Sequence, residues 1–170
     1  MYTLRGRILC ALASIVLAIL LLRSGKPGGG LLFAVPPLLA WGYVRYGPIA
    51  AAFHAYHARD WRRLKRLLSE VRQPEWLRPQ DRAYFEFMSG VLAQVRGDVD
   101  EARARLSAVD AAHLRNDHMR CVLECRRAEA AITAGDRMAA ERHLAGARAI
   151  PHRAEANAEI ERLGSLVRSA

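Results

Sequence analysis

The chain has 170 residues and a formal net charge of +9, enough chain for one domain of ordinary size. The first 47 residues carry +5 of that charge and no acidic residue, and the other 123 residues carry +4. A charge of that size over 123 residues is unremarkable, and no aromatic and basic platform or Gly-rich signature accompanies it, so we expect no nucleic-acid partner.

The first element is an apolar run from Ile8 to Leu22, in which Ser14 is the one polar residue. It extends to Leu4 if Arg5 and Arg7 reach back to lipid head groups. Nineteen helical residues span about 28 Å, close to the ~30 Å hydrocarbon core of a bilayer. We therefore predict a transmembrane segment at about 4–22. A cleaved secretory signal is the alternative, but no A-x-A-like site follows the run.

A second apolar run follows the polar loop at 23–30 and covers about 31–46. Trp41, Tyr43 and Tyr46 near its end are typical of a membrane surface. Its short uncharged stretch and Pro36-Pro37 leave open a re-entrant or interfacial segment instead of a full span. Residues 1–47 are thus predicted to be a hydrophobic hairpin that anchors a second domain, 48–170.

The hairpin is followed at once by a basic cluster, which contains Arg59, Arg62, Arg63, Lys65 and Arg66. More positive charge follows the second run than lies between the two runs, so the positive-inside rule places the C-terminal domain in the cytoplasm. The cluster has two compatible interpretations. It is a surface that contacts anionic lipid head groups, or the solvated face of a helix with Leu64 and Leu68 turned inward.

From Pro48 onward the pattern predicts helices joined by short turns. Asp81 and Asp98 are predicted to cap the helices that follow them. The predicted helices are 49–58, 60–71, 82–95, 99–109, 116–134, 137–150 and a closing helix at 152–168, with an irregular connector at 74–79.

A constant step along the chain organises this helical part. It relates Asp60, Asp98 and Asp136, whose numbers differ by 38 each time, and it also aligns two further sets of small or apolar residues. These sets are Ala52, Gly90 and Ala128 in first helices, and Leu68, Leu106 and Leu144 in second helices. A period of this length made of two helices favours stacked helical repeats, because one unit cannot bury its apolar faces alone. An unrelated helical bundle with chance periodicity is the alternative.

The units resemble the tetratricopeptide repeat (TPR), which has a small residue in its first helix, a Gly-Asp turn, and then Ala and an apolar residue in its second helix. The matching residues are Gly90, Gly97, Asp98, Ala102 and Leu106, followed by Ala128, Gly135, Asp136, Ala140 and Leu144. Glu86, Ser89 and Ala93 depart from the family pattern, and the step is 38 instead of 34. The resemblance implies an all-α solenoid of three degenerate repeats with a C-terminal capping helix.

The resemblance also implies a concave groove lined by first helices. Its predicted partner-binding residues are Tyr56, Tyr84, Phe87, Val91, Gln94 and Glu129, and it further includes Tyr46, Ile49, Phe53, Val122, Cys125 and Ile132. Such a surface suits an apolar helix or an extended peptide. The alternative is that the aromatic residues are core between stacked repeats.

Motifs for chemistry are missing from the sequence. There is no phosphate loop, no G-x-S-x-G and no H-E-x-x-H, so we expect neither an enzyme nor a cofactor. His118, Cys121 and Cys125 share one helix face, but structural zinc takes four ligands, and buried thiols are the better interpretation. A metal or redox sensor remains a third, weaker alternative.

The function expected from these features is that of a membrane-anchored scaffold or adaptor. It would hold a protein partner at the cytoplasmic face, and the layout resembles that of bacterial inner-membrane TPR proteins. The alternative is a structural subunit of a larger membrane complex, in which the hydrophobic hairpin forms part of the interface.

Overall fold

The computed structural model describes residues 12–13, 15–17, 19–20, 23–24, 34, 36–37 and 48–169. The chain divides into two compact units, Met1–Gly47 and Pro48–Ala170. Throughout the described residues the regular structure is helical, without a strand, which confirms the all-α prediction. The described residues also contain no helix long and apolar enough to cross a membrane. Both predicted membrane segments, 4–22 and 31–46, lie largely outside the described residues.

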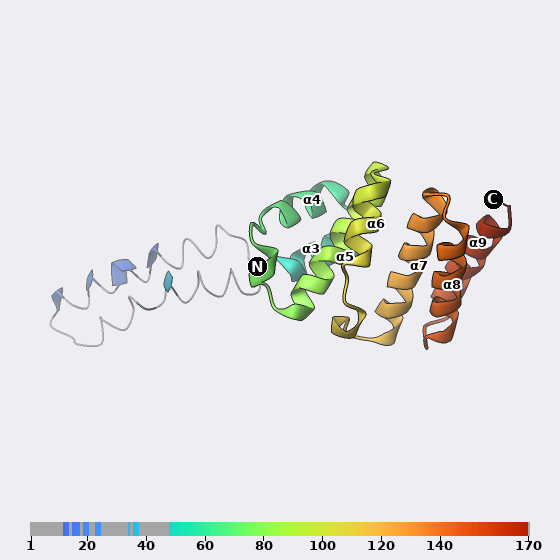
Figure 1. Cartoon of the computed structure of the whole chain (residues 1–170). Helices are drawn as coiled ribbons and strands as arrows, with labels where there is room; N and C mark the ends of the chain where they lie inside the picture. Colours follow the sequence, from blue (N-terminus) through green and yellow to red (C-terminus); the bar gives the residue numbers. More distant parts are fainter. Residues whose placement is uncertain are drawn as a thin grey trace. The chain divides into compact units, whose positions relative to one another are not determined.

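The second unit consists of helices that follow one another in chain order (Figure 1). They are α3 (Ile49–His57), α4 (Trp61–Ser69), α5 (Pro79–Arg96), α6 (Val99–Ser107), α7 (Asp117–Thr133), α8 (Arg137–Ala149) and α9 (Glu155–Ser169). Two short 3-10 turns, η2 (Pro74–Trp76) and η3 (Ala111–His113), occupy the connectors. The starts of α5, α7 and α9 are equally spaced, and those of α4, α6 and α8 have the same spacing. This spacing equals the interval from Asp60 to Asp98, so the step predicted from the sequence sets the helix starts.

Each second helix begins at an aspartate cap. The side chain of Asp60 accepts a hydrogen bond from the Arg63 amide at 3.0 Å, and Asp98 and Asp136 accept equivalent bonds from Glu101 and Ala139. Such a cap satisfies an amide at the helix start that lacks a partner within the helix. The three caps make the turns of the three helix pairs equivalent.

The residue before each cap has a left-handed backbone. Gly97 and Gly135 have φ of 78° and 74°, and Arg59 occupies the same position with φ of 54°. The following aspartate amides donate to the carbonyls of Ala55, Ala93 and Ala131 at 2.9, 3.0 and 2.9 Å. These bonds form the six-residue closure of a Schellman motif, which favours glycine at the left-handed position. Arg59 therefore adopts a conformation that costs free energy for a residue with a Cβ atom.

The helices pack first within pairs and then between pairs. The pairs are α3 with α4, α5 with α6 and α7 with α8, while α5 contacts α3 and α4, α7 contacts α5 and α6, and α9 contacts α7 and α8. One apolar cluster extends from α3 to α7, and a second joins α7, α8 and α9. Each added first helix thus buries the pair before it, as stacking of repeats requires.

Small residues permit the close approach of the two helices in a pair. A Cβ atom on Gly90 of α5 would lie 2.7 Å from Cγ of Leu106 on α6, so alanine does not fit there without movement. Ala52 and Ala128, at the equivalent positions, are fully buried.

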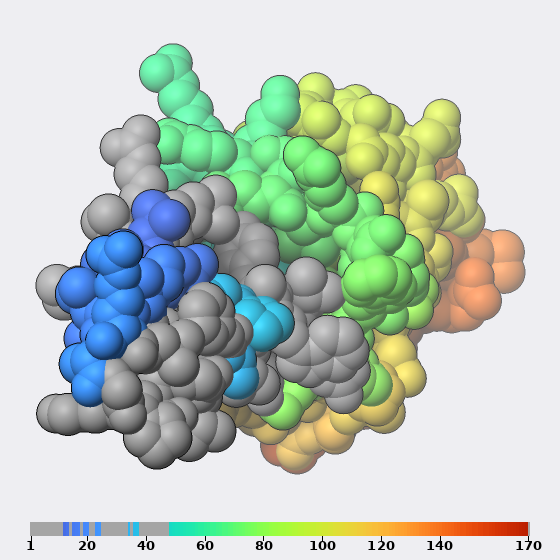
Figure 2. All heavy atoms as spheres, turned by 90° about the vertical axis from the view of Figure 1, so that its left-hand side faces the viewer, coloured from blue at the N-terminus to red at the C-terminus, as the bar shows by residue number. Residues whose placement is uncertain are grey.

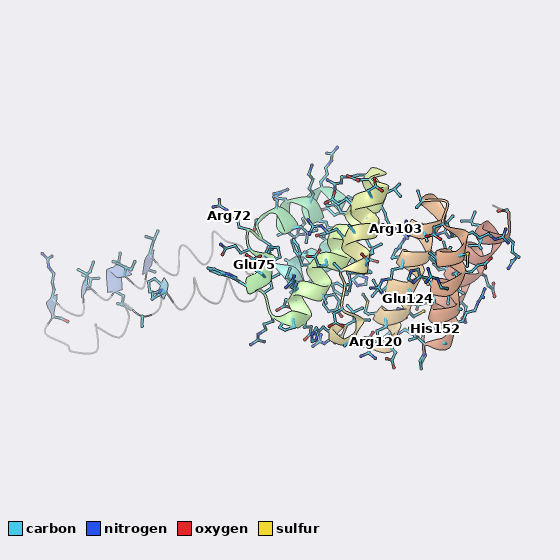
Figure 3. All side chains as sticks on the ribbon, viewed as in Figure 1. Arg72, Glu75, Arg103, Arg120, Glu124 and His152 are labelled. Atoms are coloured by element: carbon cyan, nitrogen blue, oxygen red, sulfur yellow. The ribbon has the colours of Figure 1, made fainter. Side chains whose placement is uncertain are left out.

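Polar contacts join successive pairs. Arg127 of α7 donates to the carbonyls of Leu106 and Val109 at the end of α6, at 3.1 and 2.9 Å, and pairs with Glu124 at 2.8 Å. Arg103 of α6, which is labelled in Figure 3, pairs with the capping carboxylate of Asp136 at 2.8 Å. The charged heads thereby satisfy carbonyls at the end of one helix and support the start of another.

Four helix boundaries differ from the prediction by two or more residues, among them the end of α4, which is at Ser69 and not at Val71. The helix expected to begin at Arg82 after a cap by Asp81 begins instead at Pro79, because proline is well suited to the first helical turn, and Asp81 lies in that turn without capping it. The α6 helix ends at Ser107 and not at Val109. The closing helix begins at Glu155 and not at His152, whose ring contacts the Ile150 carbonyl and the Asn157 side chain.

Candidate functional site

A groove of about 1430 Å³ runs along the second unit and is lined mainly by first helices. Its described lining residues come from α3, α5, α7 and α9, with contributions from Trp61 at the start of α4 and from the turns before α4, α7 and α9. The second helices α6 and α8 contribute none of the lining. Since the first helices of successive pairs lie along one side, the groove follows from the order in which the pairs stack.

One end of the groove is aromatic. The rings of Phe53 and Tyr84 meet edge to face with centroids 5.2 Å apart, and Tyr56 meets Trp61 at 6.4 Å. The ring of Tyr56 also packs edge to face on Phe87 at 5.5 Å. Edge-to-face contacts hold these rings in fixed orientations, so this end presents a shaped apolar wall.

The other end of the groove is charged. Glu129 of α7 pairs with Arg126 at 2.6 Å and with Arg162 of α9 at 3.2 Å, and Arg162 also pairs with Glu159 at 2.8 Å. The hydrogen bonds from Arg162 lower the pKa of Glu159 below its usual value. These ion pairs connect α7 with α9 and leave this wall polar but nearly neutral.

Two buried polar atoms in the lining have no hydrogen-bond partner among the described residues. They are Oε1 of Gln94 on α5 and Nδ1 of His118 on α7. The amide nitrogen of Gln94 donates to the Arg126 carbonyl at 2.9 Å, which fixes the direction of the free oxygen. Buried polar atoms are normally paired, so these two atoms are exceptions beneath the surface of the groove.

The structure brings together five of the six predicted groove residues. Tyr56, Tyr84, Val91, Gln94 and Glu129 line the groove, and so do Ile49, Phe53, Val122 and Cys125. Phe87 does not line it, because its side chain is fully buried between α3 and α5 as part of the first apolar cluster. Ile132 also lies outside the lining, and Tyr46 lies outside the described residues.

The last helix contributes to the groove in a way that was not predicted from the sequence. Arg153, Glu155, Glu159 and Arg162 line the groove, although the segment was predicted to be a cap only. The signal was present, because α9 begins one full step after α7 and therefore occupies the place of another first helix. The predicted apolar groove thus has one charged wall.

The two described cysteines are unsuited to reactive or metal chemistry. Cys121 and Cys125 are both free and buried. Burial, together with the adjacent Cys121, raises the pKa of Cys125 to about 12, and burial also raises the pKa of Cys121. Within the described part of the chain no three His, Cys, Asp or Glu side chains are grouped to hold a metal ion. A neutral thiol is a poor nucleophile and a poor ligand.

The predicted basic cluster lies on α4 and the turn before it. Arg59, Arg62, Arg63, Lys65 and Arg66 are all exposed, and long side chains of the α4 segment extend from the surface in Figure 2. Of these five, only Arg59 lines the groove. The cluster is therefore a surface separate from most of the groove, and we call these five residues the α4 basic face.

Comparisons with known proteins add no family to this description. No protein-family model, no curated protein and no solved structure matches the chain.

Proposed function

We propose that this protein is a membrane-anchored adaptor whose TPR-like repeats hold a protein partner at the cytoplasmic face of a membrane. The proposed binding site is the groove along α3, α5, α7 and α9. The proposed anchor is the hydrophobic hairpin within residues 1–47. The three helix pairs form the TPR-like solenoid, and α9 takes the place of the first helix of a fourth pair.

The equivalence of the three turns supports the TPR-like assignment. Asp60, Asp98 and Asp136 cap the second helices at equal intervals along the chain, and each cap follows a left-handed residue. The helix contacts also follow the order expected for a solenoid, in which each first helix packs on both helices of the preceding pair.

The observation that carries the proposal is the groove itself, which is formed by the first helices of all three pairs together with α9. It offers one aromatic end and one charged end to a bound segment. An extended peptide or a helix therefore suits the groove, with an apolar side chain at the aromatic end near Phe53 and Tyr84 and polar groups near Glu129.

Exposed apolar side chains support the anchor. The described residues Leu12, Val16, Leu17, Ile19 and Leu20 lie in helical segments and are each about half exposed. Burying such a set in lipid is favourable. Burial against protein subunits is favourable for the same reason, and this keeps a structural subunit of a membrane complex as the second candidate.

One pair of variants tests the groove. Val95 and Met138 are both exposed apolar residues, but Val95 lines the groove and Met138 lies on α8 outside it. In affinity purification of the full chain from solubilised membranes, Val95→Arg should abolish capture of the partner and Met138→Arg should preserve it. Equal capture by both variants would show that the partner does not bind in the groove.

A further inference from the structure

The positive charge of the second unit is concentrated in one segment. Residues 59–72 contain six basic and two acidic residues, whereas residues 73–170 contain 15 of each sign. The whole formal charge of +4 in Pro48–Ala170 therefore comes from α4 and its two flanks. Such segregation creates a local positive potential that a neutral remainder does not cancel.

The helix geometry turns this charge outward. At about 100° per residue, Arg62, Arg63, Lys65 and Arg66 lie on one side of α4 and Leu64 and Leu68 on the other. The leucines are buried in the first apolar cluster, and the four cations are exposed. Packing of the leucines thus fixes the direction in which the cations face.

The cations of the α4 basic face are unpaired among the described residues. None of them makes an ion pair or a side-chain hydrogen bond there, whereas Arg96, Arg103, Arg105, Arg120, Arg126, Arg127, Arg137 and Arg162 on later helices each pair with a carboxylate. Like charges three or four residues apart, as in Arg62 with Arg66 and Arg63 with Arg66, destabilise a helix. An external anion would relieve this repulsion.

We propose that the α4 basic face is a docking site for the head groups of anionic phospholipids. Guanidinium groups bind phosphate in a bidentate manner, and each cation near an anionic surface increases partitioning about fivefold. The inference rests on the membrane location in the proposed function, but it does not require a partner in the groove. It assigns α4 to the membrane side of the domain.

Two features favour lipid over nucleic acid as the occupant. The second apolar run, as predicted from the sequence, ends at about position 46, and α4 begins soon after it at Trp61. Extended chain spans at most about 3.5 Å per residue, so a domain anchored by that run keeps α4 within about 50 Å of the bilayer. In addition, α4 is a short helix, and its one aromatic residue, Trp61, is partly buried against the first apolar cluster and packs on the ring of Tyr56, so its ring is already occupied.

The test uses the piece 48–170, which is one of the two compact units and contains every described member of both apolar clusters. Binding is measured by co-sedimentation with vesicles of phosphatidylcholine alone and of phosphatidylcholine with an equal part of phosphatidylglycerol. We expect binding to the anionic vesicles only, weakening as salt is raised because the charges are exposed.

The decisive variant is Arg62→Gln, Arg63→Gln, Lys65→Gln and Arg66→Gln in one chain, which leaves the groove lining unchanged. Its matched control is Arg82→Gln, Arg142→Gln, Arg148→Gln and Arg168→Gln, which removes the same net charge from exposed positions elsewhere. The first variant should lose anionic-vesicle binding by more than about tenfold, and the control should lose far less, because charge far from the surface is screened.

Three results would overturn the proposal. They are equal binding to neutral and anionic vesicles, equal losses in the two variants, or tighter binding of duplex DNA or RNA through the same four cations. Failure here is distinguishable from failure of the adaptor function, because partner capture is measured with Val95→Arg, which leaves α4 unchanged.

Discussion

The carboxylate of Glu124 on α7, which is labelled in Figure 3, lies 2.8 Å from Nδ1 of His143 on α8. The same contact recurs one repeat earlier, where Glu86 on α5 lies 3.0 Å from Arg105 on α6. Both contacts join the first helix of a pair to the second. Glu86 is 8% exposed, so its charge is stabilised by the guanidinium instead of by water. A polar contact of this kind fixes how the two helices of a pair are aligned.

Removing one partner of this contact should destabilise the domain. Arg105→Ala leaves the carboxylate of Glu86 buried without a cation, and we expect a loss of about 1–3 kcal/mol in the free energy of unfolding. Urea unfolding of 48–170 measures it. The double variant Glu86→Leu with Arg105→Leu should recover most of the loss, because no buried charge then remains. Additive losses in the double variant would contradict this account.

Replacing Arg59 by glycine should stabilise the domain. It has φ of 54° at the position that Gly97 and Gly135 occupy in the other turns, so Arg59→Gly should raise the free energy of unfolding by about 1 kcal/mol. Arg59→Ala keeps the Cβ atom and should bring no gain, which separates the backbone effect from loss of the long side chain. A gain with alanine equal to that with glycine would show that the backbone of Arg59 is not strained.

Gly90 should tolerate no larger residue. Gly90→Ala places its Cβ atom 2.7 Å from Cγ of Leu106, and we expect a loss of about 1–3 kcal/mol from overpacking. Gly146 of α8 provides the matched control, because an added Cβ atom would lie 3.5 Å from Glu124, an ordinary contact. Gly146→Ala should therefore stabilise by about 0.5–1 kcal/mol, as expected for a helix interior. Thermal melting of both variants would reveal the opposite signs.

The thiol of Cys125 should make stability fall at alkaline pH. Its pKa is raised from 9.0 to about 12, so the neutral form is favoured in the folded state. Below pH 9 the Cys125 thiol is protonated in both the folded and the unfolded state, so its contribution to the free energy of unfolding is fully present. Between pH 9 and about 12 only the unfolded thiol ionises, and the free energy of unfolding decreases.

Cys125→Ala should reduce this decline in stability. Alkylation at pH 8, mapped by mass spectrometry, should label Cys121 and Cys125 quickly only after unfolding in guanidinium, because both thiols are buried. Rapid labelling of either residue in the folded protein would show that the second apolar cluster, which contains both thiols, is open to solvent.

Local signals in the sequence were sufficient for most of the helical frame. Asp98 was predicted as a cap because aspartate before an apolar period satisfies the first amides of a helix, and the constant step related Asp60 and Asp136 to it; the structure places a second helix after each of the three. Helix ends were less predictable. Pro79 begins α5 because proline fits the first turn, although Asp81 had the composition of a cap.

Long-range packing determined the features of the groove that could not be predicted from the sequence. Phe87 falls at a groove position in the repeat frame, yet Tyr56 packs edge to face over it and leaves it fully buried. The charged wall depends on α9 lying against α7, which allows Arg162 to reach Glu129 on the preceding first helix. Arg59 could be suspected of strain only by aligning it with Gly97 and Gly135.

The most direct test of the adaptor function is affinity purification of the full chain from solubilised membranes in parallel with the piece 48–170, with bound proteins identified by mass spectrometry. We predict that both forms capture the same partner and that Val95→Arg removes it from both, because the described residues that line the groove belong to the second unit. A partner captured only by the full chain would contradict this account and would identify the protein as a subunit that binds through residues 1–47.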